Sequence, residues 1–211
     1  KYCIPRGVKH IRDDVKKVIV DDDGVKELVL DSGDIVTADL FVDCTGWKSL
    51  LIGESLKVPF TSYSDIIPNN RAWATQVPYI DKEKELEPYT NCTALENGWV
   101  WNIPLWSRIG TGYVYSDKYI SKEDALDEFK NHLKTGMTIP NPDRIADDLK
   151  FKDIEMRIGI HDRPWEKNVV SIGLSCGFIE PLESNGLLTV HIFLLNPVRS
   201  RLNLQLLARQ Q

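Results

Sequence analysis

A chain of 211 residues can bury one sizeable core, or one domain together with part of another. Its 42% hydrophobic and 27% charged residues are typical of a globular protein. The net charge of −5, with acids and bases mixed along the chain, argues against a nucleic-acid-binding surface. No apolar run approaches the roughly 20 residues that a membrane-spanning helix needs, and the first residues lack the pattern of a secretory leader.

Cysteine usage favours a reducing compartment. The four cysteines are widely spaced and form no Cys-x-x-Cys pair, so we expect neither a metal site nor a disulfide framework. The pattern predicts reduced, mostly buried thiols in a cytoplasmic protein. The residues concerned are Cys3, Cys44, Cys92 and Cys176.

The first predicted elements form a β-meander. Strand-like runs at 15–20 and 25–30 flank the Asp-Asp-Asp-Gly segment 21–24, and Asp-Gly between such runs is a strong hairpin signal because Gly accepts positive φ. A second turn at 31–34 leads into the short strand 35–37.

A short apolar run at 39–44 then ends in Thr45 and Gly46. It predicts a buried strand, and in open α/β sheets ligands bind beyond the carboxyl ends of such strands. The alternative is an ordinary core strand that ends in a turn, and this feature alone favours the alternative.

The middle of the chain predicts an antiparallel sheet. Strand-like runs follow one another at 72–79, 89–95, 99–105 and 109–115, and the acidic, helix-prone segment 81–87 is expected to be solvated.

A helix is predicted next, from the N-cap Ser121 to the stop at Gly136, with Asp124 in the capping-box position. The apolar face of this helix would consist of Ala125, Leu126, Phe129 and Leu133.

The last third of the chain predicts a strand–loop–helix unit. A strand at 154–160 and a polar bend at 161–165 precede a buried strand at 169–174. The helix 187–195 is apolar nearly all round, so we expect it to be buried.

The start of that last helix is a candidate anion site. A helix start has unpaired N–H groups and a partial positive charge, and Ser184, Asn185 and Gly186 lie where this start should be. Glu183 stands beside them in an apolar segment, where burial would favour the protonated carboxyl and make it a plausible acid–base group. The competing interpretation, favoured by these residues alone, is that Glu183 and Ser184 only cap a helix.

A second candidate site is the strand containing Trp99 and Trp101. Alternation places both indoles on one face, with Pro104 at the strand end, and two indoles on one face can wall a tunnel or bind a ring. Ordinary core packing is the alternative that the pattern alone favours.

Four segments resemble signature motifs of flavin-dependent halogenases of the tryptophan-halogenase type. The Trp-x-Trp-x-Ile-Pro signature is matched by residues 98–104, and the Phe-x-Glu-Pro-Leu-Glu-Ser segment by residues 178–184. The strand Asp-Leu-x-Val-Asp-Cys-Thr-Gly is matched by 39–46, and Gly-Thr-Gly-Tyr-Val-Tyr-Ser by 110–116. The matches are colinear and cover most of the chain, so the chain is identified as a member of this family.

The resemblance implies a mixed α/β and α+β fold: a fragment of a glutathione-reductase-like FAD-binding fold of the hydroxybenzoate-hydroxylase type, with an antiparallel sheet on the substrate side. Residues 1–46 would belong to the FAD-binding domain, residues 47–160 would form the substrate and tunnel side, and residues 161–211 would return to the FAD-binding domain with the halide loop.

The resemblance also implies roles for individual residues. Glu183, with Ser184 beside it, matches the catalytic glutamate, which hydrogen-bonds the oxidant or stabilises the ring cation and takes its proton. Halide would bind the backbone at Asn185 and Gly186; the family usually has Thr at position 185, so halide preference stays open. Flavin contacts would come from Gly46, Gly173, Leu174 and Leu187, and the tunnel wall from Trp99, Trp101 and Pro104.

The implied activity is FAD-dependent halogenation of an aromatic compound. Reduced FAD, supplied by a separate flavin reductase, reacts with O2 to a hydroperoxide, and a halide (chloride, bromide or iodide) attacks it to give hypohalous acid. Tryptophan or another indole is the expected substrate, with phenols and pyrroles open. We expect no nucleic-acid or membrane partner, and a homodimer is compatible with the sequence.

Two alternatives remain at this point: a flavin-dependent aromatic monooxygenase, which shares the meander and the crevice, and a non-catalytic remnant. The chain begins at Lys1 without Met and contains neither a Gly-x-Gly-x-x-Gly loop nor the family's lysine motif. We therefore expect a piece of a longer protein that neither holds FAD tightly nor halogenates alone.

Overall fold

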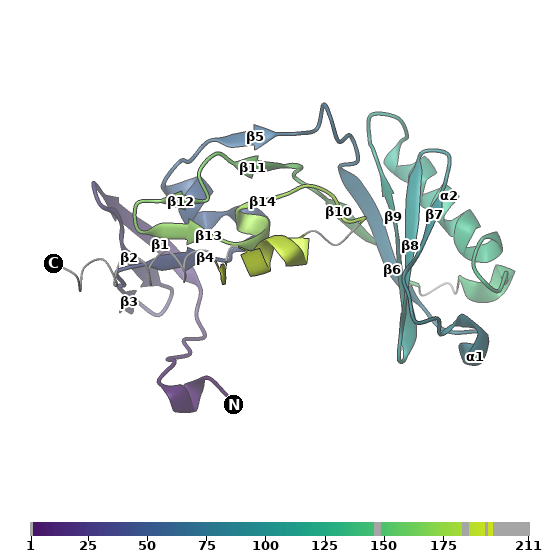
Figure 1. Ribbon diagram of the computed structural model, residues 1–211, viewed down its shortest axis with the longest axis horizontal. Coiled ribbons are helices and arrows are strands. Elements are labelled where there is room, and N and C mark those ends of the chain that lie inside the picture. Colours follow the sequence, from purple (N-terminus) through teal and green to yellow (C-terminus); the bar gives the residue numbers. More distant parts are fainter. Residues whose placement is uncertain (1, 146–148, 183–185, 193, 196–211) are drawn as a thin grey trace. The chain divides into compact units, whose positions relative to one another are not determined.

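The computed structural model describes residues 2–145, 149–182, 186–192, 194 and 195. Contacts within the chain divide it into two compact units (Figure 1). Unit 1 comprises Lys1–Thr61, Ile160–Gly177 and Gly186–Gln211, and unit 2 comprises Ser62–Gly159 and Phe178–Asn185.

Unit 1 contains the predicted β-meander. Strands β1 (Val15–Asp21), β2 (Gly24–Leu30) and β3 (Ile35–Val36) form an antiparallel sheet in the order β1-β2-β3. The turn requires glycine for two reasons: Gly24 has a φ of 126°, and a Cβ there would lie 2.1 Å from the Asn168 side-chain oxygen. The hairpin prediction is confirmed.

A second sheet of unit 1 has the order β12-β13-β4 and contains the predicted buried strands. Strand β4 (Phe41–Asp43) runs parallel to β13 (Val169–Ser171), while β12 (Trp165–Glu166) pairs antiparallel with β13. Parallel pairing brings the carboxyl ends of β4 and β13 to the same edge. The core of the unit consists of Val25, Phe41, Leu51, Ile52, Val58 and Val169.

Unit 2 contains a five-stranded antiparallel sheet in the order β10-β6-β9-β8-β7 (Figure 1). Four of its strands confirm the four predicted runs. The bounds are Lys152–Glu155 for β10, Arg71–Val77 for β6, Arg108–Tyr115 for β9, Gly98–Leu105 for β8 and Asn91–Ala94 for β7.

The single strand predicted at 154–160 is wrong, because the chain forms two strands there. Strand β10 ends at Glu155, and β11 (Gly159–His161) begins at a glycine with a φ of 144°, outside the range that a continuous strand allows. Strand β11 instead joins β5 (Phe60–Ser62) and β14 (Gly177–Phe178) in a sheet of order β14-β11-β5.

Helix α2 (Lys122–Thr135) covers one face of the five-stranded sheet, as its apolar pattern predicts. The Ser121 hydroxyl caps the helix by accepting a hydrogen bond from the Asp124 N–H at 3.1 Å, and it donates one to the Asp124 carboxylate at 2.7 Å. The core beneath the helix includes Val77, Val100, Tyr113, Tyr115, Ala125, Phe129 and Leu133.

The acidic segment 81–87 contains helix α1 (Lys82–Glu85) and is not wholly solvated, contrary to expectation. Glu85 is 2% exposed because its carboxylate pairs with Arg144. A partner so distant in sequence could not be inferred from the local acidic pattern.

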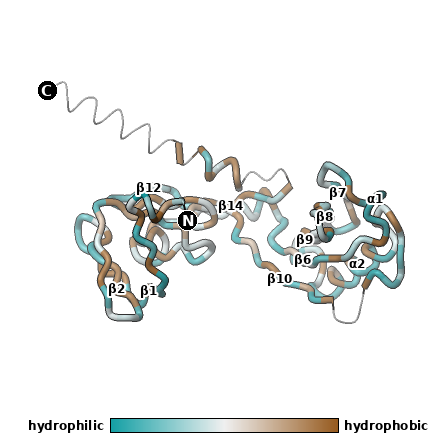
Figure 2. Tube along the Cα trace, turned by 90° about the horizontal axis from the view of Figure 1, so that it is seen from below, coloured by the Kyte–Doolittle hydropathy of each residue, from teal (hydrophilic) through white to brown (hydrophobic). Residues whose placement is uncertain are grey.

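The burial predicted for the last helix is also wrong. Described residues 186–192, 194 and 195 are helical, yet Leu187 is 69% exposed and the side chains of Leu188, Ile192, Leu194 and Leu195 are also exposed. Most described residues of this helix are hydrophobic and coloured brown in Figure 2, and a helix that is apolar nearly all round needs packing partners on every side. Of residues 187–192, 194 and 195, however, only Thr189 and Val190 are half-buried.

The cysteines are free, as expected, but Cys3, Cys44 and Cys92 are exposed and only Cys176 is buried. Cys3 lies in an exposed N-terminal turn, and Cys92 lies on strand β7 at the sheet edge. Within the described ranges, no helix combines the length and apolar character needed to cross a membrane. The same residues contain no group of His, Cys, Asp and Glu suited to a metal ion.

Candidate active site

Asp43 organises the edge where β4 and β13 end in unit 1. Its side chain is fully buried and accepts hydrogen bonds from the Thr45 N–H (3.0 Å) and hydroxyl (2.6 Å). The other carboxylate oxygen accepts from the backbone N–H groups of Leu51 (2.8 Å) and Ile52 (2.9 Å), which lie in the π-helix Leu50–Ser55. These bonds satisfy a buried charge and fix the chain that follows β4.

The chain after β13 is fastened to the same edge. The backbone carbonyl of Asp43 accepts hydrogen bonds from the Ile172 N–H, at 3.0 Å, and from the Ser175 hydroxyl. The Ser49 hydroxyl donates to the Ser175 carbonyl at 2.9 Å, and all these groups are buried. The two turns that end the parallel strands are therefore held beside each other.

Two glycines leave the backbone of these turns accessible. Gly46 and Gly173 have φ values of 68° and 70°, which side-chain-bearing residues rarely adopt. A Cβ on Gly46 would have no atom within 4 Å, and one on Gly173 would meet only Val190 Cγ2, at 3.5 Å. The open surface over both backbones fits the close approach of a flat ring system such as a flavin.

The thiols near this edge do not favour nucleophilic chemistry. Although Cys44 is exposed at the surface, partial desolvation of its thiol, together with the Asp43 charge, raises the pKa of that thiol. Burial likewise raises the pKa of Cys176, although a hydrogen bond involving Ser171 opposes it. Both groups therefore stay protonated near neutral pH.

The predicted halide loop falls largely outside the described residues. Glu183, Ser184 and Asn185 are not among them, so their predicted catalytic and halide-binding roles stay predictions. Gly186 is described as the first residue of a helical stretch, and a Cβ on it would meet nothing within 4 Å. The space on the Cβ side of Gly186 is therefore open. Leu174 and Leu187, predicted to contact flavin, are 36% and 69% exposed.

Unit 2 contains a pocket lined by the predicted tryptophan pair. Trp99 and Trp101 lie on one face of β8, with ring centroids 6.0 Å apart and planes tilted by 58°. Val100, between them, points into the core under α2, so the indoles occupy the opposite face of the sheet. In the described chain the two indoles are half-buried and lie outside the core under α2. The pocket, of about 370 Å³, is lined by Thr90, Cys92, Trp99, Trp101, Ile103, Pro181 and Leu182 and is called the tryptophan pocket below.

A glycine on the neighbouring strand sets the position of Trp101. Gly112 pairs with Trp101 across the sheet, and a Cβ on Gly112 would lie 2.1 Å from the indole Cζ2 atom. The indole therefore lies directly over this glycine. Pro104, predicted to lie at the strand end, is the penultimate residue of β8 and pairs with Ile109 of β9. It is not among the residues that line the tryptophan pocket.

Sequence reasoning missed several lining residues of the tryptophan pocket. Cys92 could have been found, because it pairs with Trp101 across antiparallel strands and so shares its face. Pro181 and Leu182 come from a segment some eighty positions further along the chain, and no local pattern indicates their approach.

These two features, bare glycine backbone at the ends of parallel strands and an aromatic pocket on an antiparallel sheet, are compatible with a flavin-dependent enzyme acting on an aromatic compound. Comparison with known sequences specifies the class: the sequence model of the family described as tryptophan halogenase matches residues 1–203. The chain belongs to the tryptophan halogenase family.

Individual relatives agree with this assignment. The chain is 44% identical over 191 residues to tryptophan 6-halogenase SttH of Streptomyces toxytricini, and 38% identical over 196 residues to tryptophan 7-halogenase RebH of Lentzea aerocolonigenes. These alignments cover 90% and 92% of this chain and 35% of each relative. The chain thus spans about a third of the length of the curated relatives that it matches.

Solved structures show the same fold. The crystal structure of SttH superposes with a TM-score of 0.81 at 43% identity, over 90% of this chain and 36% of that one. The structure of Tar14, a tryptophan C-6 flavin-dependent halogenase from taromycin biosynthesis, gives a TM-score of 0.80 at 41% identity, over 90% and 36%.

Proposed function

We propose that the protein carrying this chain is a flavin-dependent halogenase that places a halogen on an aromatic ring, with tryptophan or another indole as acceptor. The observation that carries the proposal is the indole pair of Trp99 and Trp101, which lines a pocket in a chain of the tryptophan halogenase family. The whole activity is a proposal because the chain spans only part of its relatives.

The residues proposed to hold FAD lie in unit 1. Gly46 and Gly173 present bare backbone, and Leu174 and Leu187 present exposed apolar side chains. When bound in reduced form, after delivery by a separate flavin reductase, FAD would use O2 to oxidise a halide to hypohalous acid. Asp43 would hold the crevice in shape from beneath, through the hydrogen bonds to Thr45, Leu51 and Ile52.

Halide and acid–base roles are proposed for the segment before the last helix. The backbone of Gly186, which has open space on its Cβ side, would bind halide together with that of Asn185 through N–H groups at a helix start. Glu183, next to Ser184, would accept the ring proton: the ring carbon bonds to the halogen as the halogen–oxygen bond of hypohalous acid breaks, and the released hydroxide takes up the proton as water.

The tryptophan pocket would keep the acceptor in a dry, aromatic environment. Stacked or edge-on contact with Trp99 and Trp101 suits an indole, whose flat apolar ring presents the same kind of surface. Their bulk would also hinder direct attack of the flavin on the substrate. We further infer that unit 1 provides the FAD-binding side, of the glutathione-reductase-like type, and that unit 2 provides the substrate side.

A chimeric enzyme, called the exchanged enzyme, tests the proposal. This chain would replace the matching 191 residues of SttH, so that the remaining two thirds of the enzyme come from the relative. With a flavin reductase, tryptophan and bromide, we expect bromotryptophan by mass spectrometry, and no product of oxidation when halide is omitted. A hydroxylated product that forms equally without halide would instead favour the flavin-dependent monooxygenase, which shares the meander and crevice but needs no tryptophan pair.

A further inference from the structure

Two tyrosines of the segment 110–116 lie in the core beneath helix α2 and take no part in the proposed active site. Tyr113 and Tyr115, both on strand β9, are fully buried. Their rings stack, with centroids 5.7 Å apart and planes inclined by 26°. The two phenols are thus alike in burial and in ring packing, and they differ in what their hydroxyl groups contact.

The Tyr113 hydroxyl is hydrogen-bonded to a carboxylate. It donates to Glu128 Oε2 on helix α2 at 2.6 Å, a length typical of a strong hydrogen bond to a charged acceptor. The side-chain amide of Asn97 donates to the same oxygen at 3.4 Å, and the Glu96 N–H donates to Oε1 at 3.1 Å. These contacts fix the carboxylate, so a proton that leaves Tyr113 has an acceptor already in place.

The Tyr115 hydroxyl has no such acceptor. It is buried and has no hydrogen-bond partner among the described residues. Burial, followed by the charge of Asp153, raises the pKa of Tyr115 to about 12. Burial and then the hydrogen bond to Glu128 raise the pKa of Tyr113, so both phenols are protonated near neutral pH. Because a charged phenol radical is costly in an apolar core, oxidation requires that the proton leave with the electron. Tyr113 meets this requirement and Tyr115 does not.

Trp73 is another oxidisable ring beside Tyr113, and its surroundings disfavour a positive charge. Trp73 pairs with Tyr113 across β6 and β9, so both side chains lie on the α2 side of the sheet. The Lys122 ammonium lies 5.2 Å from the centre of the Trp73 ring. An indole that loses an electron becomes positively charged, and the ammonium repels that charge. An oxidising equivalent on this side of the sheet is therefore more stable on Tyr113.

Strand β9 connects Tyr113 to the tryptophan pocket. Trp101 lies over Gly112 on the other face of the sheet, where a Cβ would be 2.1 Å from the indole Cζ2 atom. Tyr113 follows Gly112 in the chain, and successive side chains of a strand point to opposite faces. The indole thus contacts the backbone that carries the phenol, and only the thickness of the sheet separates the two rings for electron transfer.

We propose that Tyr113 is a redox-active tyrosine, with Glu128 as its proton acceptor, that takes over an oxidising equivalent formed on Trp101. A peroxyl radical that removes one electron from Trp101, and takes a proton from water, becomes a hydroperoxide and leaves an indole radical cation. An electron then passes from Tyr113 to Trp101, and the phenolic proton moves to Glu128 Oε2. The products are a neutral indole, a neutral tyrosyl radical and a neutral carboxylic acid.

This transfer protects the tryptophan pocket, because it restores the indole before the ring is permanently oxidised. A thiolate in solution completes the cycle: it gives one electron to the tyrosyl radical and becomes a thiyl radical, while the proton returns from Glu128 to Tyr113. The proposal goes beyond the proposed function and does not depend on it.

Flash photo-oxidation of the 211-residue chain tests the proposal without flavin or halide. A ruthenium(III) polypyridine complex, generated by the flash, is the one-electron oxidant, and tyrosyl radicals are followed by optical absorption and electron paramagnetic resonance. We expect a radical that outlives those of the exposed tyrosines, and Tyr113→Phe should abolish it. Tyr115→Phe is the matched control and should keep it, because Tyr115 is equally buried but lacks a proton acceptor in the described chain.

The variant Glu128→Gln tests the proton transfer. Glutamine keeps an oxygen that can accept the hydrogen bond from Tyr113, but it is a far weaker base. Formation of the long-lived radical should slow at least roughly tenfold. Glu123→Gln, an exposed glutamate of the same helix, should leave the rate unchanged. Urea denaturation of each variant shows whether it is folded.

Damage to Trp101 is a second measurement. After exposure to peroxyl radicals from a thermal initiator, peptide mass spectrometry should find more oxidised Trp101 in Tyr113→Phe than in the unchanged chain or in Tyr115→Phe. The proposal is overturned by the absence of a long-lived radical, by its persistence in Tyr113→Phe, or by an undiminished rate in Glu128→Gln. Equal damage to Trp101 in all three chains would also overturn it. Formation of bromotryptophan by the exchanged enzyme is a separate outcome, since halogenation does not require this electron transfer.

Discussion

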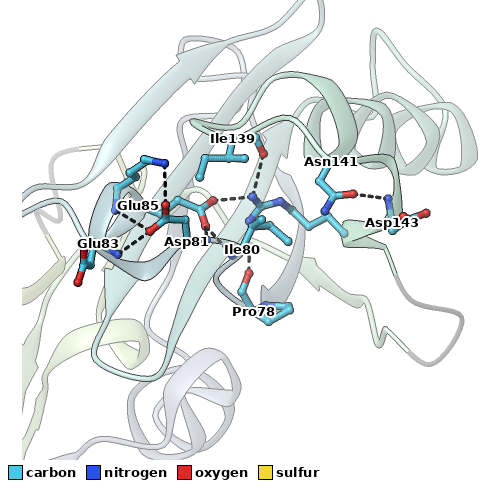
Figure 3. Close-up of polar contacts among 10 residues, drawn as sticks. Pro78, Ile80, Asp81, Glu83, Glu85, Ile139, Asn141 and Asp143 are labelled. Carbon is cyan, nitrogen blue, oxygen red and sulfur yellow. Dashed lines mark hydrogen bonds and ion pairs between the residues drawn. The ribbon is translucent and has the colours of Figure 1, made fainter.

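Glu85 and Arg144 form a buried ion pair that joins helix α1 to the segment after α2 (Figure 3). The Arg144 Nη2 atom lies 2.5 Å from Glu85 Oε1, and their side chains are 1% exposed or less. The guanidinium also donates to the carbonyls of Ile139 and Pro78, and the carboxylate accepts from the Ile80 and Asp81 N–H groups. Both charges are thus almost fully compensated inside unit 2.

Removing one partner should be strongly destabilising. Glu85→Gln would leave the buried Arg144 guanidinium without its counter-charge, and Arg144→Met would leave the buried Glu85 carboxylate without its own. Each change should lower the free energy of unfolding by about 3–5 kcal/mol. Urea denaturation would measure this cost. Lys84→Gln is the control, because the Lys84–Asp81 pair is on the surface with the lysine side chain 74% exposed, and we expect a much smaller loss of stability there. Similar losses in all three variants would contradict the assignment.

The Trp101 indole should be sensitive to any side chain beneath it. Gly112→Ala places a Cβ 2.1 Å from the ring and 2.7 Å from the Trp73 carbonyl oxygen, so the indole must move. We expect a loss of about 1–3 kcal/mol in the free energy of unfolding and a shift in tryptophan fluorescence. Gly110→Ala, on the same face of β9 with no atom nearer than 3.8 Å, should leave both unchanged.

Asp43 should contribute more than its neighbours to holding the chain after β4 in place. Asp43→Asn keeps the size of the side chain but replaces one accepting oxygen with an amide nitrogen, which cannot accept from the Leu51 and Ile52 N–H groups. We expect a loss of about 1–3 kcal/mol in the free energy of unfolding, measured by urea denaturation. The exposed Asp39→Asn substitution should change little, and equal effects at both positions would refute this role for Asp43.

His132 should make unit 2 sensitive to mild acid. Its side chain is buried on α2, and burial lowers its pKa from the ordinary 6.5. The unfolded chain therefore binds a proton near that pH while the folded chain does not, so stability falls as the pH drops below about 6.5. His132→Gln should flatten the dependence of Tm on pH between about 7 and 5, whereas the exposed His10→Gln should leave its slope unchanged.

Local patterns predicted the helices and strands well where the two-residue alternation of a strand or the residues of a turn gave a strong signal. The alternation of Trp99, Val100 and Trp101 placed the indoles correctly on one face, and Asp23-Gly24 marked the hairpin. Partners distant in sequence could not be predicted. The segment around Glu85 was expected to be solvated, since the buried partner of Glu85, Arg144, lies 59 positions further along the chain.

Burial was the least predictable property. Apolar composition indicated that helix 187–195 is buried, but burial depends on what surrounds a helix, which its own sequence does not specify. The same holds for Cys92, which was expected to be buried but is exposed on the edge strand β7, where it lines the tryptophan pocket. The helix start indicated an anion site at Ser184 and Asn185 and an acid–base group at Glu183, whereas only the resemblance specified halide binding and halogenation; these roles stay predictions.

The most direct test of the central claim is the rate of bromotryptophan formation by the exchanged enzyme when Glu183 is changed to Gln. The account predicts that Glu183→Gln lowers the rate at least roughly a hundredfold, in line with the loss of a general base, while Glu54→Gln, an exposed control, keeps the rate of the unchanged enzyme. An undiminished rate in the Glu183→Gln enzyme would contradict the assignment of this segment as the halogenation site.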